Sequence, residues 1–297
     1  MKSFTNISKG LFLTPGFRIL FFLFIFAVVF AFPVSAQRVA ILTPDNEPPS
    51  ISFAKSLEDE LGKDLKVLDT SRSQTAFLSA PTETPFNLTT TEAKNIGAAI
   101  GCDFFILIKS ATQRRSSYLR PEYYESFAAI YVVSSRTGRL IFWKLSSFED
   151  QKPEISRKKL TDAAPSVASE IIRNIRLAAA AEISEPDPLR LEEVPEDNSP
   201  GAKNFRSPVP YRRIKPEYTA LASLYDVKAT VDIVVDLDAD GVILHTEIVR
   251  WAGFGLDESV EKAVRTMNWR PAMRNGKALP MRFLVRYNFT KVPKETP

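Results

Sequence analysis

The stretch with the most suggestive chemistry is "DLDADGVILHTE", Asp236 to Glu247, which has the residue spacing of an EF-hand calcium loop. Its three aspartates and final glutamate would be the oxygen ligands, and Gly241 would form the turn. An EF-hand needs a helix on each side, but the flanks "ATVDIVV" and "VILHTEIV" alternate as strands do. A strand beginning at Val242 would carry Glu247 roughly 17–20 Å from the turn. We therefore predict a solvated hairpin turn and no metal site.

The remaining reactive side chains do not form a recognisable catalytic set. Cys102 is the only cysteine, so no intrachain disulfide can form, and its apolar neighbours in "IGCDFFILI" favour a buried thiol. His245 is the only histidine, which excludes the usual zinc clusters. Paired carboxylates, a nucleophile elbow and a glycine-rich phosphate loop are also absent from the sequence. We predict that the protein is not an enzyme, with no catalytic, cofactor-binding or metal-binding residue.

The first 36 residues have the pattern of a secretory signal. Three basic residues and no acidic ones accompany the apolar run "ILFFLFIFAVVFAF", which is followed by "PVSA". The run is shorter than the ~20 residues that span a bilayer comfortably. The sequence predicts cleavage after Ala36 and a periplasmic protein. The alternative is an uncleaved inner-membrane anchor, in which case the chain contacts the membrane only through this segment.

Net charge gives no support for nucleic-acid binding. The formal charge of +4 falls to +1 when the three positive charges of residues 1–36 are set aside. Nucleic-acid recognition needs a concentrated basic face, which this balance does not provide.

Composition divides the rest of the chain into two domains. Residues 183–210, "ISEPDPLRLEEVPEDNSPGAKNFRSPVP", are rich in proline and acidic residues and lack hydrophobic periodicity, which predicts an extended linker. Residues 37–182 before it alternate strand and helix patterns and predict an α/β layered domain. Residues 211–297 after it form the second domain. The fold class is therefore α+β, with two domains following the signal segment.

Within the first domain the order is a β-α-β opening, a helical stretch, three strands and a closing helix. "ESFAAIYVVSS" and "LIFWKLSSF" flank "RTGR" and predict an antiparallel hairpin. This order, with "IGAAIGCDFFILI" following a helix, resembles the N-terminal domain of TolB and the CsgG-like periplasmic domains over residues 37–181. That resemblance implies a module that contacts other envelope proteins.

The second domain has the order α-β-β-α-β. "KPEYTALASLYD" predicts a short helix with Pro216 in its first turn. "VKATVDIVVDLD" and "VILHTEIVRW" predict a hairpin, and "LDESVEKAVRTMN" has helical spacing with acids in its first turn. In "WRPAMRNGKALP" we expect Trp269 to pack into the core and Asn275-Gly276 to turn the chain into the last strand, "PMRFLVRYNF".

This run of motifs resembles the C-terminal domain of TonB-family proteins over residues 212–289. The matching residues are "YTALA", "VDIVVDLDADGVI", the "LD-x-x-V-x-x-A-V" helix, "WRPA" with its "NGK" turn, and the final strand. Thr219 departs from the family, which usually has proline after the tyrosine. The resemblance implies a three-stranded antiparallel sheet whose last strand is an exposed edge. In the family, an extended segment of an outer-membrane receptor adds to that edge.

The resemblance also implies which residues bind the partner. On the last strand, alternation predicts that Met281 and every second residue after it face the core. The residues predicted to contact the partner are Arg212, Lys215, Pro216, Tyr218, Arg282, Leu284, Arg286 and Asn288.

Two functions stay open at this point. The first is a TonB-family protein that binds an outer-membrane receptor or other envelope protein, with or without energy-coupled transport. The second is an envelope assembly or scaffold protein with no energy transduction. The first 36 residues lack the histidine of the Ser-x-x-x-His face with which the family engages its motor, so the binding half of the machinery is predicted and the motor-coupling half is not.

Overall fold

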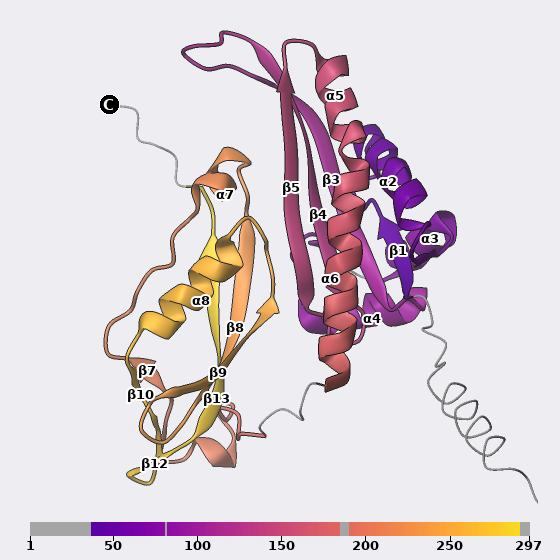
Figure 1. Cartoon of the computed structure of the whole chain (residues 1–297). Helices are drawn as coiled ribbons and strands as arrows, with labels where there is room; N and C mark the ends of the chain where they lie inside the picture. The colour runs from indigo at the N-terminus through magenta and orange to yellow at the C-terminus, as the bar shows by residue number, and fades with distance from the viewer. Residues whose placement is uncertain (1–36, 81, 185–189, 292–297) are drawn as a thin grey trace, which may run out of the picture. The chain divides into compact units, whose positions relative to one another are not determined.

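The computed structural model describes residues 37–80, 82–184 and 190–291 (Figure 1). The predicted signal segment lies outside these residues, as does its alternative as an anchor. Within the described ranges no helix has both the length and the apolar character needed to cross a membrane. Residues 37–297 form one compact unit.

The N-terminal half is built on a five-stranded mixed sheet. Strand order is β2-β1-β3-β4-β5, with β1 parallel to β2 and β3, and β4 antiparallel to both β3 and β5. The strands are β1 (Arg38–Leu42), β2 (Lys66–Val67), β3 (Phe104–Arg115), β4 (Tyr123–Ser134) and β5 (Leu140–Asp150). The predicted β-α-β opening and the hairpin across "RTGR" are both confirmed.

Helices cover the two faces of this sheet differently. Helices α2 (Pro48–Leu61), α5 (Pro153–Asp162) and α6 (Ala164–Ser184) lie along the sheet (Figure 1), and their apolar side chains form a core against one of its faces. Side chains of α3 (Thr70–Ser79) and α4 (Thr90–Ile100) contribute to the core on the other face. Helix α4 begins with a capping box formed by Thr89 and Glu92.

The C-terminal half has the predicted α-β-β-α-β order. Its main sheet is antiparallel, with order β13-β8-β9. The main elements are α7 (Ala220–Leu224), β8 (Ala229–Leu237), β9 (Ile243–Arg250), α8 (Leu256–Thr266) and β13 (Met281–Phe289). Turn Asp238–Gly241 joins β8 to β9, and the Asp238 carboxylate accepts hydrogen bonds from Asp240 N and Val242 N at 2.8 Å each. The hairpin predicted across the calcium-like motif is thus confirmed.

Two expectations about local structure were wrong. Helix α7 begins at Ala220, with the Thr219 hydroxyl accepting from Ala222 N, so Pro216 precedes the helix. Thr219, which departs from the family's proline, provides this N-cap. Asn275-Gly276 turns β11 into β12, with β13 beginning only at Met281. The short elements are η1 (Pro200–Ala202), β6 (Phe205–Arg206), β7 (Val209–Pro210), β10 (Trp269–Arg270), β11 (Ala272–Arg274) and β12 (Lys277–Leu279).

Part of the proline-rich segment is ordered against these short strands. Strand β7 pairs with β10, and β6 pairs with β11. Residues 205–206 and 209–210 are therefore in β pairing, where composition predicted an unpacked linker. Proline and like charges favour extended backbone, and extended backbone can also pair when a strand edge lies beside it.

A single apolar core joins the second face of the N-terminal sheet to residues of the C-terminal half. Trp251, which is 1% exposed, packs on Tyr131 with ring centroids 5.7 Å apart. Its indole Nε1 donates to Gly138 O at 3.3 Å. The Asn87 side chain donates to Trp251 O and Thr230 O at 2.7 Å and accepts from Thr230 N at 2.9 Å.

The loop that carries Trp251 is held by one carboxylate. Asp257, in the first turn of α8, accepts hydrogen bonds from Ala252 N at 2.9 Å and Gly253 N at 2.8 Å. Burial raises the pKa of Asp257 from 3.8 to about 7, against the lowering effect of these two donors. The folded protein therefore binds a proton here at a pH where the unfolded chain has lost it.

We expect Asp257 to make the protein less stable as pH rises from about 4 to about 7. Because its folded pKa lies above its unfolded pKa, its contribution is most favourable below pH 4 and falls until the pH passes 7. The measurement is the free energy of unfolding against pH for the wild type and for Asp257→Asn. The difference between the two curves should slope only in this window. Asp240→Asn, in the exposed turn, is the control, and a difference curve flat from pH 4 to 7 would contradict the prediction.

Candidate functional site

Strand β13 is an edge of the C-terminal sheet, and one side of it pairs with β8 along its whole length. On its other side, the pairing found among the described residues is confined to Arg282, which bridges to Glu193. Arg282 N donates to Glu192 O, and Arg282 O accepts from Val194 N. Both backbone groups of Arg282 thus point away from β8.

The rest of the edge follows from alternation. In an antiparallel pair, every second residue directs its N–H and C=O to the same neighbour. Since Arg282 directs both groups outward, Leu284, Arg286 and Asn288 do so too. This stretch of about 13 Å, at ~3.3 Å per residue, presents donors and acceptors that no described residue pairs with, of a kind that accepts an added strand.

Side chains of β13 alternate as the sequence predicted. Met281 and Phe289 are buried, and the rings of Phe283 and Tyr287 pack against the core. Leu284, in contrast, is 52% exposed. The residues on this opposite face are Arg282, Leu284, Arg286 and Asn288.

The two arginines of this face are already engaged by buried aspartates of β8. Arg282 Nε and Nη2 each donate to Asp236 at 2.7 Å, and Arg286 donates to Asp232 at 2.7 and 2.9 Å. Asp236 and Asp232 side chains are 0% and 3% exposed. Hydrogen bonding to the aspartates raises the pKa of both guanidinium groups. The arginines therefore neutralise buried charge, a role that was not predicted from the sequence.

Of the predicted binding residues before α7, two pack against the domain and two are exposed. The Tyr218 hydroxyl donates to Ala222 O and Val227 O at 3.1 and 2.9 Å, and its ring stacks on Phe289 at 6.3 Å. Burial raises the pKa of Tyr218. Pro216 is buried, whereas Arg212 and Lys215 are exposed. Tyr218 and Pro216 thus support the C-terminal end of β13, and the two cations lie at the surface.

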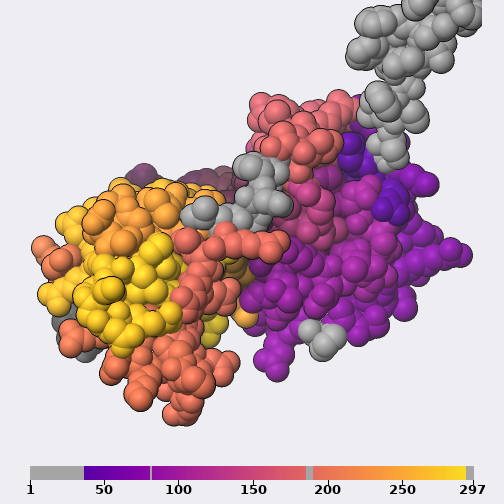
Figure 2. All heavy atoms as spheres, turned by 90° about the horizontal axis from the view of Figure 1, so that it is seen from below, coloured from indigo at the N-terminus to yellow at the C-terminus, as the bar shows by residue number. Residues whose placement is uncertain are grey.

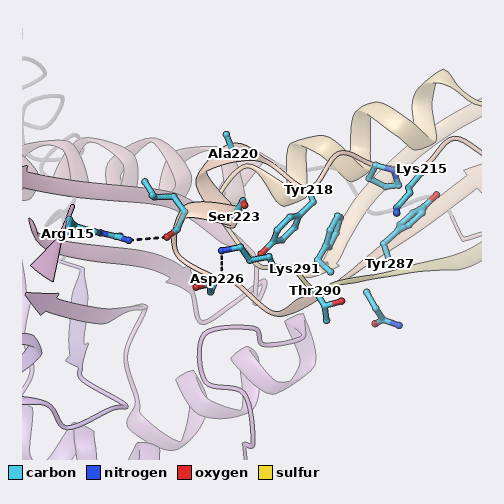
Figure 3. A pocket seen from close by; sticks show the side chains of 13 residues that line it. Arg115, Lys215, Tyr218, Ala220, Ser223, Asp226, Tyr287, Thr290 and Lys291 are labelled. Atoms are coloured by element: carbon cyan, nitrogen blue, oxygen red, sulfur yellow. Dashed lines mark hydrogen bonds and ion pairs between the residues drawn. The ribbon is translucent and has the colours of Figure 1, made fainter. Parts of the chain in front are cut away.

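A cleft of about 920 Å³ lies at this end of β13 (Figure 3). It brings together four of the predicted residues, Lys215, Pro216, Tyr218 and Asn288. Figure 3 shows Arg115 directed to the Leu224 carbonyl oxygen, and Lys291 paired with Asp226 across the cleft. Lys215 has no ion pair among the described residues, which leaves a cation available for an acidic group.

The remaining predicted residues lie elsewhere along the edge. Arg282 and Leu284 line a cleft of about 550 Å³ together with Glu193, Val194 and Pro208. Arg286 lines a third cleft, of about 690 Å³, which it shares with Asn288. Arg212 lines none of these three clefts. The predicted set is therefore spread along β13 and does not form one pocket.

The oxygen ligands of the calcium-like motif are also separated by the fold. Asp236 is bound to Arg282, and Glu247 on β9 accepts from Arg139 Nε at 2.7 Å. Within the described ranges no group of three or more His, Cys, Asp or Glu side chains is placed to hold a metal ion. Cys102 is buried, as predicted, and burial raises the pKa of its thiol.

Comparison with known proteins identifies the C-terminal part of the chain. Residues 214–290 match the family model for the Gram-negative bacterial TonB protein C-terminal. No curated protein matches the chain. The resemblance of residues 37–181 to TolB and CsgG-like domains stays a prediction.

Several solved structures are similar in part. One is the Pseudomonas aeruginosa TonB CTD, at 18% identity and a TM-score of 0.25, covering 33% of this chain and 94% of that one. Another is lipoprotein GNA1162 from Neisseria meningitidis, at 13% identity and a TM-score of 0.31, covering 46% and 99%. A third is the LpoB C-terminal domain from Salmonella enterica, at 12% identity and a TM-score of 0.27, covering 42% and 93%.

Proposed function

Because residues 214–290 are a TonB-family C-terminal domain, we propose that the chain is a non-enzymatic periplasmic binding protein. Its C-terminal domain accepts an extended segment of an outer-membrane receptor or other envelope protein on the open edge of β13. The observation that carries this proposal is the outward backbone of Leu284, Arg286 and Asn288, which has no strand beside it among the described residues. Added strands gain affinity from such backbone groups and specificity from the side chains between them.

The test is the substitution Leu284→Pro, which acts on the backbone of Leu284. Its N–H points outward and is not used in pairing with β8, so Leu284→Pro should leave the ladder to β8 intact while removing one donor from the open edge. We expect binding of residues 37–297 to synthetic peptides from receptor N-terminal segments to weaken at least about tenfold, since a lost donor leaves a partner carbonyl unsatisfied. The measurement is isothermal titration.

Leu284→Ala is the matched control, because it removes the side chain but keeps the N–H. It should retain binding within a few-fold. A folded Leu284→Pro variant with wild-type affinity would move the site away from β13, and the segment from Arg212 to Tyr218 would be tested next.

Whether binding is coupled to energy depends on the first 36 residues. A chain that keeps this segment can transmit force from the inner membrane, whereas a cleaved chain is a scaffold or assembly protein in the periplasm. The core shared by both halves of residues 37–297 favours the scaffold role, because it packs the two folded halves against each other. Intact-mass measurement of the native protein distinguishes the two cases.

A further inference from the structure

One end of the binding edge is occupied by the chain itself. Residues Glu192–Val194, here called the strap, run parallel to β13 beside Arg282. Arg282 N donates to Glu192 O at 2.8 Å, and Val194 N donates to Arg282 O at 3.2 Å. One residue bonded to two partners that are two positions apart is the pattern of a parallel ladder. The strap therefore forms a single parallel β-bridge to the edge.

A charged side chain anchors the strap as well. Arg274 Nη1 and Nη2 donate to the two carboxylate oxygens of Glu192 at 3.0 and 2.5 Å. This two-point contact lowers the pKa of Glu192. Arg274 Nε is buried without a hydrogen-bond partner in the described part of the chain. Arg274 thus binds the acidic side chain of the strap through its two terminal nitrogens.

The strap stops where the open edge begins. A parallel strand that continued would next use the N–H of residue 196 and the C=O of Val194 against Leu284. The strap does not continue in this way: the described residues show no backbone hydrogen bond between Leu284 and Val194 or Glu196, and Ser199 N donates to Glu196 O in a turn. In the space-filling view, coral residues near 200 lie directly beside the yellow C-terminal residues (Figure 2). Among the described residues no strand lies beside the edge from Leu284 to Asn288, and this edge leads to the cleft that holds Lys215.

We propose that the strap is an internal pseudo-ligand of the β13 edge, an inference that rests on the proposed function. The partner is an extended acidic peptide that runs parallel to β13. Its carboxylate takes the place of Glu192 on Arg274, and its following residues pair with Leu284, Arg286 and Asn288. A partner that uses the whole edge must displace the strap, so the strap lowers the apparent affinity by the fraction of molecules in which it is closed.

The test uses a synthetic peptide, RLEEVTVTV, which copies Arg190–Val194 and replaces the proline with residues that can continue a strand. It is titrated into residues 37–297 and into the released variant Glu192→Ala/Val194→Pro, which lacks both the ion pair and the Val194 donor. If the strap is closed about 90% of the time, release should tighten binding about tenfold. The control is Glu196→Ala, which removes an acidic residue outside the strap and should leave the affinity unchanged.

Two further measurements test whether the strap covers Arg282 and whether the charge of the peptide matters. Hydrogen exchange should show the Arg282 amide protected in the wild type and exposed in the released variant without peptide. Peptide RLQEVTVTV, with glutamine in place of the first glutamate, should bind the released variant at least about fivefold more weakly, since a charged hydrogen-bond pair is lost. Arg274→Ala in the released variant should abolish the difference between the two peptides.

The outcomes separate this inference from the function on which it rests. If the wild type and the released variant bind with equal affinity and Leu284→Pro still loses binding, the strap does not compete for the edge. The proposed binding edge itself would then stand. Equal binding of the two peptides would overturn the acidic partner. Binding that Leu284→Pro does not change would overturn the proposed function itself.

Discussion

Replacing Arg282 with alanine should lower the free energy of unfolding by about 3–5 kcal/mol, because it leaves a buried carboxylate without its cation. Asp236 is 0% exposed, and both of its oxygens accept from Arg282 at 2.7 Å. The described residues give Asp236 no other cation. Chemical denaturation of residues 37–297, followed by circular dichroism, measures the loss.

Arg286→Ala is the matched control. Its partner, Asp232, also accepts from Arg250 Nε at 3.3 Å, so one cation remains after the substitution. The loss should therefore be clearly smaller than for Arg282→Ala. The double variant Arg282→Met/Asp236→Leu should recover most of the stability, because an apolar pair can replace a buried ion pair. Equal stability of Arg282→Ala and wild type would mean that Asp236 does not depend on Arg282 for its compensation.

This result also affects how binding data are interpreted. Arg282 and Arg286 were predicted from the sequence to face a partner, and they do lie on the face opposite the core. Their guanidinium groups, however, are bound to the sheet's own aspartates. An alanine variant that fails to bind could therefore have lost its fold, and Leu284→Pro is the better probe of the edge.

The register of the C-terminal sheet could have been predicted from charge spacing. Asp232 and Asp236 are four residues apart in one alternating strand, and Arg282 and Arg286 are four apart in another. Antiparallel pairing that places each arginine opposite an aspartate fixes the register, and it is the register found. Alternation alone gave the correct face, because side chains of a strand alternate with a period of two.

Other features depend on contacts that no local pattern contains. Helix α3 has a weakly apolar sequence, "TSRSQTAFLS", and only Phe77 among its large side chains is buried, so periodicity could not detect it. Strands of two or three residues, such as β10, are too short to show alternation. Pairing of the strap with Arg282 joins residues about ninety positions apart in sequence. Its composition indicates extended backbone, but not the edge beside it.

Trp269→Ala should destabilise the C-terminal domain by about 3–5 kcal/mol, the usual cost of removing a large aromatic side chain from a core. The sequence placed Trp269 in the core, and it is 5% exposed. Its ring meets Phe283 edge-on at 5.0 Å, and its indole Nε1 donates to Val264 O at 3.3 Å. It therefore joins the end of α8 to the inner face of β13, the strand that carries the open edge.

Thermal unfolding is the measurement, and a loss of this size in a chain of this length corresponds to a fall in Tm of roughly 10 °C. Trp269→Phe should lose much less, because it keeps an aromatic ring against Phe283 and forfeits mainly the hydrogen bond to Val264 O. Leu119→Ala, at a position 87% exposed, is the surface control. If Trp269→Ala had the same Tm as the wild type, the Trp269 ring would not support β13. Because an added strand needs a straight, fixed edge to pair with, the same variant should also bind peptide more weakly at temperatures where it is still folded.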